Sequence, residues 1–346
     1  MTSTKPPDKI FPITTFLSNL PINLIQQPLQ SSRGNGPSGR LVIIGDVHGM
    51  RQSLEALLDK VSFNKSNGDH LILVGDLVNK GPDSPGVVDL AIKLGASAVR
   101  GNHENAVLNA VSEINNMWDS RESQLHPNDL SDGPAAPENS DTNPVGNPVR
   151  AKYNSGAPEI KMRASPATQS TAMALSKHHL EWLASLPLIL RIDLPHNLTS
   201  SLGYTLIVAH AGLVPGITLE EQDPHAVMHV RSLVNESGNE YRFTPTETFG
   251  EESWAVEWDR WQESLASKTT VIFGHDARRR LQLGKYTIGL DSACLYGNQL
   301  SAVVFEARDR RLYHEIVQVE CADTPVTPTV PAKEGESNTD KTEEHV

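Results

Sequence analysis

The stretch LILVGDLVNKGPDS (71–84) begins with a run of apolar residues that ends at Gly75–Asp76. A similar run, LVIIG (41–45), ends directly before Asp46 and lies close to His48. Short apolar runs that stop at glycine and polar residues are typical of buried strands. The two stretches therefore predict neighbouring strands whose carboxyl ends carry side chains able to bind a metal ion.

The segments around these two runs have an alternating pattern. Helical periodicity is visible in RQSLEALLDKV (51–61) and PGVVDLAIKL (85–94), and the second of these leads into another short strand pattern, ASAVRG (96–101). Strands that alternate with helices indicate parallel βαβ units and an α/β fold. Further apolar runs, TLIVAH (205–210) and TVIFGH (270–275), predict a second sheet. The stretch 286–307, YTIGLDSACLYGNQLSAVVFEA, is expected to form a closing antiparallel hairpin.

The composition limits the classes of function. The chain has 346 residues, of which 38% are hydrophobic, and this is enough to build one large core or two smaller ones. Its formal charge of −12 argues against a general nucleic-acid binder, so we expect no stable nucleic-acid binding. A polyanionic substrate would need a local basic pocket. No apolar run approaches the length of a membrane span.

Three segments have the composition of irregular structure. We expect a polar leader over residues 1–37, a disordered surface insertion over about 119–170, and a disordered acidic tail over 323–346. The catalytic domain is then expected over residues 38–322. Neither terminal segment is expected to take part in the chemistry.

Five apolar runs end in, or lead directly into, potential metal ligands. In open α/β sheets, ligands bind beyond the carboxyl ends of the strands, so these residues can meet in one crevice. They are Asp46 with His48, Asp76, Asn102 with His103, His210, and His275. Mixed oxygen and nitrogen ligands suit two divalent ions such as Zn, Mn, Co or Fe. Asp76 is the expected bridging ligand between the two ions.

Several motifs resemble those of the calcineurin-like metallophosphoesterases, and within them the ApaH-like branch. The motifs are GDVHG (45–49), GDLVNKGPDS (75–84), RGNHE (100–104), HAGLVPG (210–216) and FGHDA (273–277). The stretch 274–303 is similar to the fungal zinc-dependent endopolyphosphatases of this group. The resemblance implies two mixed β-sheets packed as a sandwich and flanked by helices (αββα).

The resemblance also implies roles for individual residues. One metal ion would be held by Asp46, His48 and Asp76, and a second by Asp76, Asn102, His210 and His275. The same comparison makes His103 the general acid. Protein phosphatases of the superfamily have Asp–Arg where this chain has Asn79–Lys80. Asn79 can hydrogen-bond His103 without bringing a negative charge, and Lys80 offers a point charge instead of a bidentate fork. This chain has Arg280 and Ala293 at two positions where glycines are expected in the endopolyphosphatase pattern.

Four basic residues are candidates for contact with phosphate. Lys80 and Arg100 flank the metal loops and could stabilise charge on the transition state, although Arg100 could equally pair with a local carboxylate. Arg231 is a candidate phosphate ligand. Arg278, with the two arginines after it, could line the rim of the site or form a solvated charge run.

The pattern favours a dinuclear metal-dependent hydrolase of phosphoanhydride bonds, acting on inorganic polyphosphate as an endopolyphosphatase. Alternatives are a hydrolase of dinucleoside polyphosphates or RNA caps, a serine/threonine protein phosphatase, and a non-catalytic phosphate-binding scaffold. Asn79 and Lys80 disfavour the protein phosphatase. We expect a cytoplasmic monomer, with the vacuolar lumen as the alternative location.

The cysteines and three of the tryptophans are predicted to have structural roles. The chain has two cysteines, Cys294 and Cys321, which are too few for a disulfide framework or a thiolate metal site. Cys294 is expected to be a small buried hydrophobic residue. Trp254, Trp258 and Trp261 share one helical face, which predicts core packing, with stacking on a nucleobase as the alternative.

Overall fold

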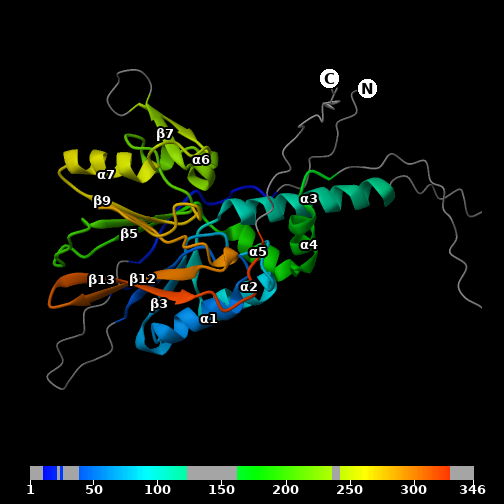
Figure 1. Ribbon diagram of the computed structural model, residues 1–346, viewed down its shortest axis with the longest axis horizontal. Coiled ribbons are helices and arrows are strands. Elements are labelled where there is room, and N and C mark those ends of the chain that lie inside the picture. Colours follow the sequence, from blue (N-terminus) through cyan, green and yellow to red (C-terminus); the bar gives the residue numbers. More distant parts are fainter. Residues whose placement is uncertain (1–10, 22–23, 26–38, 123–161, 236–241, 328–346) are drawn as a thin grey trace, which may run out of the picture.

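The computed structural model describes residues 11–21, 24–25, 39–122, 162–235 and 242–327. Two mixed sheets pack face to face, and helices cover the outer side of each sheet (Figure 1). Helices α1 (Arg51–Lys60) and α2 (Ser84–Leu94) lie on one side, and α7 (Trp254–Ser264) lies on the other. The expected αββα sandwich is confirmed.

The first sheet contains the βαβ units that the alternating pattern predicts. Its five strands lie in the order β13 (Arg311–Glu320), β12 (Gln299–Arg308), β2 (Leu41–Ile44), β3 (His70–Leu73) and β4 (Ser97–Ala98). Strands β2, β3 and β4 are parallel, with Leu41 opposite His70 and Ile72 opposite Ser97. Their carboxyl ends therefore lie at one edge of the sheet.

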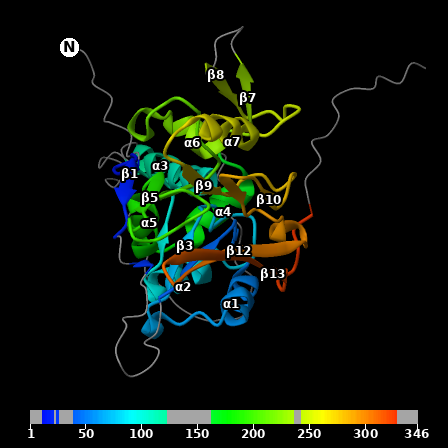
Figure 2. The same ribbon diagram turned by 90° about the vertical axis from the view of Figure 1, so that its left-hand side faces the viewer.

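The second sheet has six strands. Their order is β1 (Leu17–Asn19), β5 (Ile189–Asp193), β6 (Thr205–Ala209), β9 (Thr269–Phe273), β11 (Thr287–Gly289) and β10 (Gln282–Leu283). Strands β6, β9 and β11 run parallel. A separate antiparallel ribbon, β7 (Ser232–Asn235) with β8 (Phe243–Thr246), lies beside α6 (Pro224–His229) and α7 (Figure 2).

The core is layered because side chains alternate along each strand. In β2, Leu41 and Ile43 belong to the cluster between the sheets, while Val42 and Ile44 pack with Leu54 of α1. The remaining helices are α3 (Asn102–Glu122), α4 (Pro166–Ala174) and α5 (Lys177–Ser185). Within the described part of the chain, no helix is long and apolar enough to cross a membrane.

The tryptophan face packs into the core, as expected. Trp254 and Trp258 are 1% and 2% exposed and belong to the cluster between α7 and the second sheet. Trp254 meets the ring of Phe273 edge to face at 4.9 Å between centroids. Neither ring is available to stack on a nucleobase.

The structure corrects parts of the expected domain boundaries. Residues 17–19 of the expected leader form β1, which pairs with β5, and Ile25 is buried in the core. The expected insertion begins and ends inside helices α3 and α4. Asp323, the first residue of the expected tail, is buried and accepts hydrogen bonds from Ser53 at the start of α1. Within the expected leader, insertion and tail, residues 1–10, 22–23, 26–37, 123–161 and 328–346 lie outside the described residues.

The hairpin expected over 286–307 is wrong. The first part of this stretch forms β11, which is parallel to β9 in the six-stranded sheet, and the last part is β12 in the five-stranded sheet. The true hairpin is β12 with β13, joined between Arg308 and Arg311. The expectation failed because the segment between the strands, which contains the short helix η5 (Cys294–Tyr296), crosses from one sheet to the other.

A disulfide joins Cys294 in η5 to Cys321 directly after β13. The bond fastens the crossing segment to the edge of the five-stranded sheet. The expectation that Cys294 is buried is correct, but its interpretation as an unpaired hydrophobic residue is wrong. Spacing alone could not show this pairing, because 27 positions separate the two cysteines in the sequence.

We predict that removing the disulfide destabilises the fold. Changing both Cys294 and Cys321 to Ala frees a loop of 27 residues in the unfolded chain and should lower the free energy of unfolding by about 3 kcal/mol. Urea denaturation measures this change. Dithiothreitol should destabilise the wild type by a similar amount and leave the double variant unaffected. Equal effects of the reductant on both proteins would contradict the disulfide.

Candidate metal centre and active-site pocket

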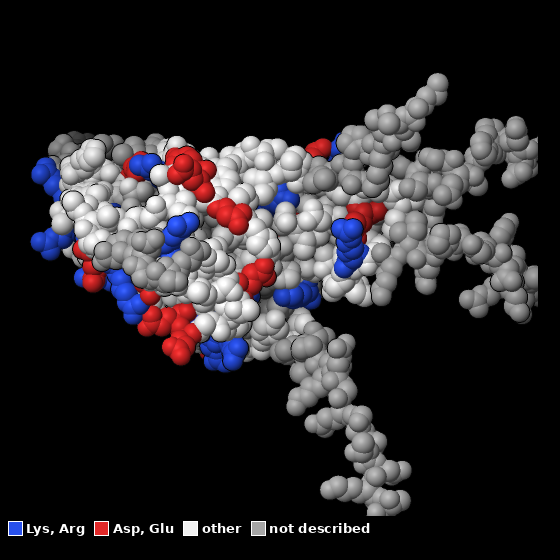
Figure 3. Space-filling view, turned by 90° about the horizontal axis from the view of Figure 1, so that it is seen from above, with Lys and Arg blue, Asp and Glu red and all other residues white. Residues whose placement is uncertain are grey.

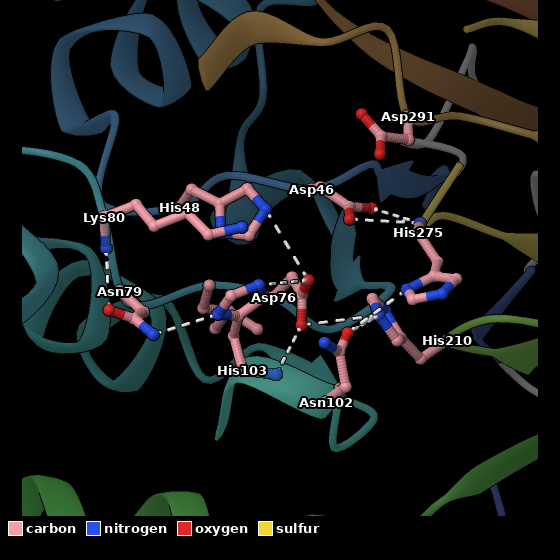
Figure 4. A network of polar contacts seen from close by, with 12 residues as sticks. Asp46, His48, Asp76, Asn79, Lys80, Asn102, His103, His210, His275 and Asp291 are labelled. Carbon is pink, nitrogen blue, oxygen red and sulfur yellow. Dashed lines mark hydrogen bonds and ion pairs between the residues drawn. The ribbon is translucent and has the colours of Figure 1, made fainter. Parts of the chain in front are cut away.

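The ends of strands from both sheets meet in one pocket of about 440 Å³. Asp46 and Asp76 follow β2 and β3, while His210 and His275 follow β6 and β9. Asn102 begins α3, shortly after β4. Figure 4 shows these residues around Asp76, whose carboxylate contacts histidines on both sides. The predicted convergence of these strand ends is therefore confirmed.

The first group of potential ligands lies on the side of the five-stranded sheet. The Nε2 atoms of His48 and His103 lie 3.5 and 3.9 Å from Asp76 Oδ2. His48 Nδ1 faces the carbonyl of Val78 at 3.4 Å, so Nδ1 carries the proton and the lone pair of Nε2 faces Asp76. Burial lowers the pKa of His48 to about 3. A neutral imidazole is the form that binds a metal ion.

The second group shares Asp76 with the first. His210 Nε2 lies 3.3 Å from Asp76 Oδ1 and 2.9 Å from Asn102 Oδ1. His275 Nδ1 lies 3.2 Å from the same amide oxygen. His210 donates its Nδ1–H to the carbonyl of Val74 at 3.0 Å, which directs Nε2 into the site. One Asp76 oxygen faces each group, as a carboxylate shared by two cations requires.

The charges in the pocket also fit cations. Asp46, Asp76 and Asp291 are all buried, and within the described ranges none of them forms an ion pair with lysine or arginine. Burial and the neighbouring carboxylates Asp291 and Asp76 raise the pKa of Asp46 well above its ordinary value. His275 Nε2 is buried without a hydrogen-bond partner among the described residues. Buried like charges are costly unless a counter-charge is present, so this donor set fits two divalent ions.

Asp291 is a site residue that the sequence interpretation missed. It lines the pocket beside Asp46 and His275, and its Oδ1 accepts the backbone N–H of Ala293 at 3.0 Å (Figure 4). Burial raises the pKa of Asp291 to about 6. It follows β11 in the same way that Asp76 follows β3. The signal was therefore present, but the expected hairpin placed this segment in another context.

Glu104 is a second missed residue, and it shapes the Asp76 loop. Its buried carboxylate accepts N–H groups of Asp76 and Leu77, each at 2.8 Å, and of Gly101 at 2.9 Å. His103 N–H in turn donates to Asp76 Oδ1 at 2.9 Å. These bonds join the loops after β3 and β4 and hold the Asp76 carboxylate between the two groups of ligands.

Backbone strain is concentrated at the pocket. Five residues of the site have positive φ angles, a conformation that side chains other than glycine rarely adopt; they are His48, Asp76, Asn79, Lys80 and His275. Such conformations persist only where the surroundings enforce them. Arg280 and Ala293 also have positive φ, at 59° and 62°, which gives a physical reason for the glycines expected at these positions.

Asn79 hydrogen-bonds His103, as expected, and the structure defines the direction of the bond. Asn79 Oδ1 accepts the backbone N–H of Lys80 at 2.9 Å, so the amide nitrogen faces His103 Nδ1 at 2.9 Å and Thr168 Oγ1 at 3.1 Å. His103 Nδ1 is then an acceptor, and the proton of the neutral ring is on Nε2. Burial lowers the pKa of His103 to about 4, against the effect of Asp76.

The structure contradicts the catalytic and substrate-binding roles expected for Arg100. This side chain is 0% exposed and does not line the pocket. It donates to Asn105 Oδ1 at 2.8 Å and to the carbonyl of Phe11 at 3.1 Å. Among the described residues, no carboxylate forms an ion pair with Arg100. The reason is that the N-terminal segment, expected to be a leader, packs against this guanidinium group.

The other expected phosphate ligands lie at the pocket. Lys80, Arg231 and Arg278 all line it. Arg279 is instead paired with Asp276 Oδ2 at 2.8 Å. The arginine run is thus divided: Arg278 lines the pocket, whereas Arg279 is paired with a neighbouring carboxylate.

Comparison with known proteins gives a consistent result. The family model described as calcineurin-like phosphoesterase matches residues 39–305. A zinc-dependent endopolyphosphatase of Saccharomyces cerevisiae is 29% identical over 291 residues, which is 81% of each chain. A symmetrical bis(5'-nucleosyl)-tetraphosphatase of Dechloromonas aromatica is 25% identical and covers 82% of this chain and 97% of its own. A crystal structure described provisionally as a diadenosine tetraphosphatase has 31% identity and a TM-score of 0.58, and covers 88% of this chain and 98% of its own.

We predict that Asp76→Asn removes the metal centre. The change leaves one neutral amide between the two ligand groups, so the content of bound metal should fall below one ion per chain and phosphatase turnover should fall by more than about 100-fold. Elemental analysis of the purified protein gives the metal content. The matched control is Asp69→Asn, a buried carboxylate that pairs with Arg40 outside the pocket and should leave the metal content unchanged. Unchanged metal content in Asp76→Asn would exclude Asp76 as a shared ligand.

Proposed function

The chain belongs to the calcineurin-like phosphoesterase family and is a metal-dependent phosphatase, and we propose that it cleaves phosphoanhydride bonds, with inorganic polyphosphate cut internally as the main substrate. The observation that carries this proposal is the amide of Asn79 against His103 Nδ1. It determines how strong an acid the site offers to the leaving group. The similarity to a zinc-dependent endopolyphosphatase supports the same substrate.

His103 is the proposed general acid. Asn79 donates to Nδ1, so the imidazole holds its proton at Nε2, on the side of Asp76. With a pKa lowered to about 4, the ring is neutral near pH 7, and a neutral imidazole is a weak acid. An alcohol such as the serine side chain needs strong protonation to leave, whereas a phosphate leaving group needs little. The site is therefore better suited to phosphoanhydrides than to phosphoserine.

We further propose that Asp46, His48 and Asp76 hold one cation and that Asp76, Asn102, His210 and His275 hold the other. When bound, two divalent cations polarise phosphoryl oxygens and make water nucleophilic at neutral pH. The donor set contains no thiolate and accommodates Zn, Mn, Co or Fe. The description of the yeast relative as zinc-dependent favours zinc.

Lys80, Arg231 and Arg278 are the proposed substrate ligands. They place positive charge around a pocket whose floor is rich in carboxylates. On the face of the molecule drawn in Figure 3, by contrast, acidic and basic side chains are interspersed. The cations at the pocket would orient a polyanion and stabilise the charge that develops on its equatorial oxygens.

A second candidate substrate is a dinucleoside polyphosphate. The side chains of Phe249 and Tyr296 line the pocket and are 41% and 37% exposed. Exposed aromatic rings can stack on a nucleobase. Two of the similar proteins described above are named for nucleoside tetraphosphate substrates.

We also propose that the protein functions outside the reducing cytosol. The Cys294–Cys321 disulfide supports this location because such bonds rarely persist in the cytoplasm. Of the two locations expected from the sequence, it favours the vacuolar lumen over the cytoplasm. The expected monomeric state stays a prediction.

The proposed substrate is tested with the purified protein in Zn, Co, Mn or Mg in turn. Long-chain polyphosphate should be converted to progressively shorter chains on a gel, with little early release of free phosphate. Diadenosine tetraphosphate is assayed in parallel, and Asp76→Asn is the inactive control. Intact polyphosphate beside cleaved dinucleotide would move the assignment to nucleotide hydrolysis.

We predict that Asn79→Asp shifts the substrate preference toward phosphoserine. A carboxylate at this position would accept the Nδ1–H of His103 and favour the protonated ring, which is the stronger acid. The ratio of kcat on a phosphoserine peptide to kcat on polyphosphate should rise by about ten-fold. Asn79→Ala, which removes the contact without adding charge, is the control and should not raise the ratio. The account of Asn79 fails if the aspartate variant shows no gain while it remains folded and metal-loaded.

A further inference from the structure

We propose that Phe249 is a positioning residue for substrate binding: its ring holds Arg231 and Arg278 at the pocket, where they bind the phosphate next to the one being hydrolysed. The inference rests on the proposed function, because it names how the same pocket would recognise a phosphoanhydride. It assigns Phe249 to the arginines and not to a nucleobase.

Three guanidinium groups surround the Phe249 ring. The central carbons of Arg231, Arg278 and Arg279 lie 5.2, 4.8 and 5.1 Å from its centroid. Cations are attracted to the face of an aromatic ring at these distances. Phe249 lies between β8 and α7, so this one ring gathers arginines from two other stretches of the chain, Arg231 from one and Arg278 with Arg279 from the other.

The loop that carries Phe249 is itself held in place. Arg279 Nη1 pairs with Asp276 Oδ2 at 2.8 Å, and its Nη2 donates to the carbonyl of Gly250 at 3.1 Å. Gly250 N–H donates to Ser232 Oγ at 2.7 Å. Arg279 therefore anchors the loop, and the ring beside it becomes a rigid support for the other two arginines.

Arg231 and Arg278 have hydrogen-bonding capacity to spare. Both line the pocket, and in the described part of the chain neither forms an ion pair with a carboxylate. Arg231 Nε is buried without a hydrogen-bond partner among the residues that the structure describes, and Arg231 Nη1 makes a long contact of 3.4 Å to the carbonyl of Glu247. Unpaired guanidinium groups at a pocket match the fork of donors that binds a phosphate.

The pair lies close enough to the candidate metal centre to act on the same substrate. Both arginines line the same pocket as Asp46, Asp76 and His275. A polyphosphate chain carries an anionic group on each side of the bond being cleaved. A substrate with a single phosphate has no second phosphate for the arginine pair to bind.

Steady-state kinetics of Phe249→Leu test the proposal on three substrates. The variant keeps an apolar side chain but loses the ring, so KM for polyphosphate should rise by about ten-fold with kcat unchanged. KM for p-nitrophenyl phosphate, which has one phosphate, should not change. The KM of diadenosine tetraphosphate as a substrate should rise by the same factor as the KM of polyphosphate. If it is tested as an inhibitor of p-nitrophenyl phosphate hydrolysis, its inhibition constant should rise by that factor. Phe249→Tyr, which keeps the ring, should restore the wild-type KM.

Two further variants separate positioning from general damage. Tyr313→Leu is the matched control, because Tyr313 is an exposed ring with Arg308 at 5.1 Å but does not line the pocket, and it should leave all three substrates unaffected. Arg278→Gln should raise KM for polyphosphate as Phe249→Leu does. Because the ring acts through the arginines, the effects of the two changes should not multiply. The fold-increase in KM of the double variant Phe249→Leu/Arg278→Gln should be well below the product of the two single fold-increases.

Each outcome has a distinct meaning. A loss confined to diadenosine tetraphosphate in Phe249→Leu would overturn the proposal in favour of stacking on adenine. Equal losses on all three substrates, or an unchanged KM for polyphosphate, would also overturn it while the proposed function stands. A wild type that cleaves p-nitrophenyl phosphate but neither anhydride would instead refute the proposed function.

Discussion

The structure depends on the burial of like charges at the meeting point of two sheets. Asp46, Asp76 and Asp291 lie in one pocket, each at most 5% exposed. Their mutual repulsion contributes to the raised pKa values of Asp46 and Asp291, in addition to burial itself. Such an arrangement is stable as a set of carboxylates only with a strong local counter-charge. Two divalent cations held there would supply that charge, and the histidines around them would complete the ligand set.

The scaffold meets this demand by placing the candidate ligands at the boundaries of strands and helices. Strands β2 and β3 of one sheet and β6 and β9 of the other deliver their polar residues to the same crevice. Glu104 accepts N–H groups from both of the loops after β3 and β4 and joins them. The left-handed conformations of His48, Asp76 and His275 store local strain that packed strands can support. The disulfide at Cys294 fastens the segment that brings Asp291 to the pocket.

Much of this site could be predicted because its signals are local. An apolar run that stops at a polar residue is visible in one stretch of sequence, and six of the expected metal-site residues lie where that rule puts them: Asp46, His48, Asp76, Asn102, His210 and His275. Asp291 obeys the same rule but was missed, because its strand was assigned to a hairpin. The roles of Arg100 and Phe249 could not be predicted in the same way. Phe11, one of the two partners of Arg100, is distant in sequence from it, and so are the arginines around Phe249, so only tertiary packing reveals these contacts.

The proposed substrate preference rests on one amide at position 79. A carboxylate there would draw the proton of His103 to Nδ1 and stabilise the imidazolium, which suits a leaving group, such as an alcohol, that needs a proton to depart. Asn79 is held by Lys80 N–H with its amide nitrogen toward the ring, so the neutral tautomer with the proton on Nε2 is favoured. The site therefore offers weak acid chemistry next to strong positive charge from Lys80, Arg231 and Arg278. That combination is least suited to an alkyl phosphate and best suited to a chain of phosphates. The leaving group of such a chain is stable without a proton, and its neighbouring phosphates can bind the basic side chains.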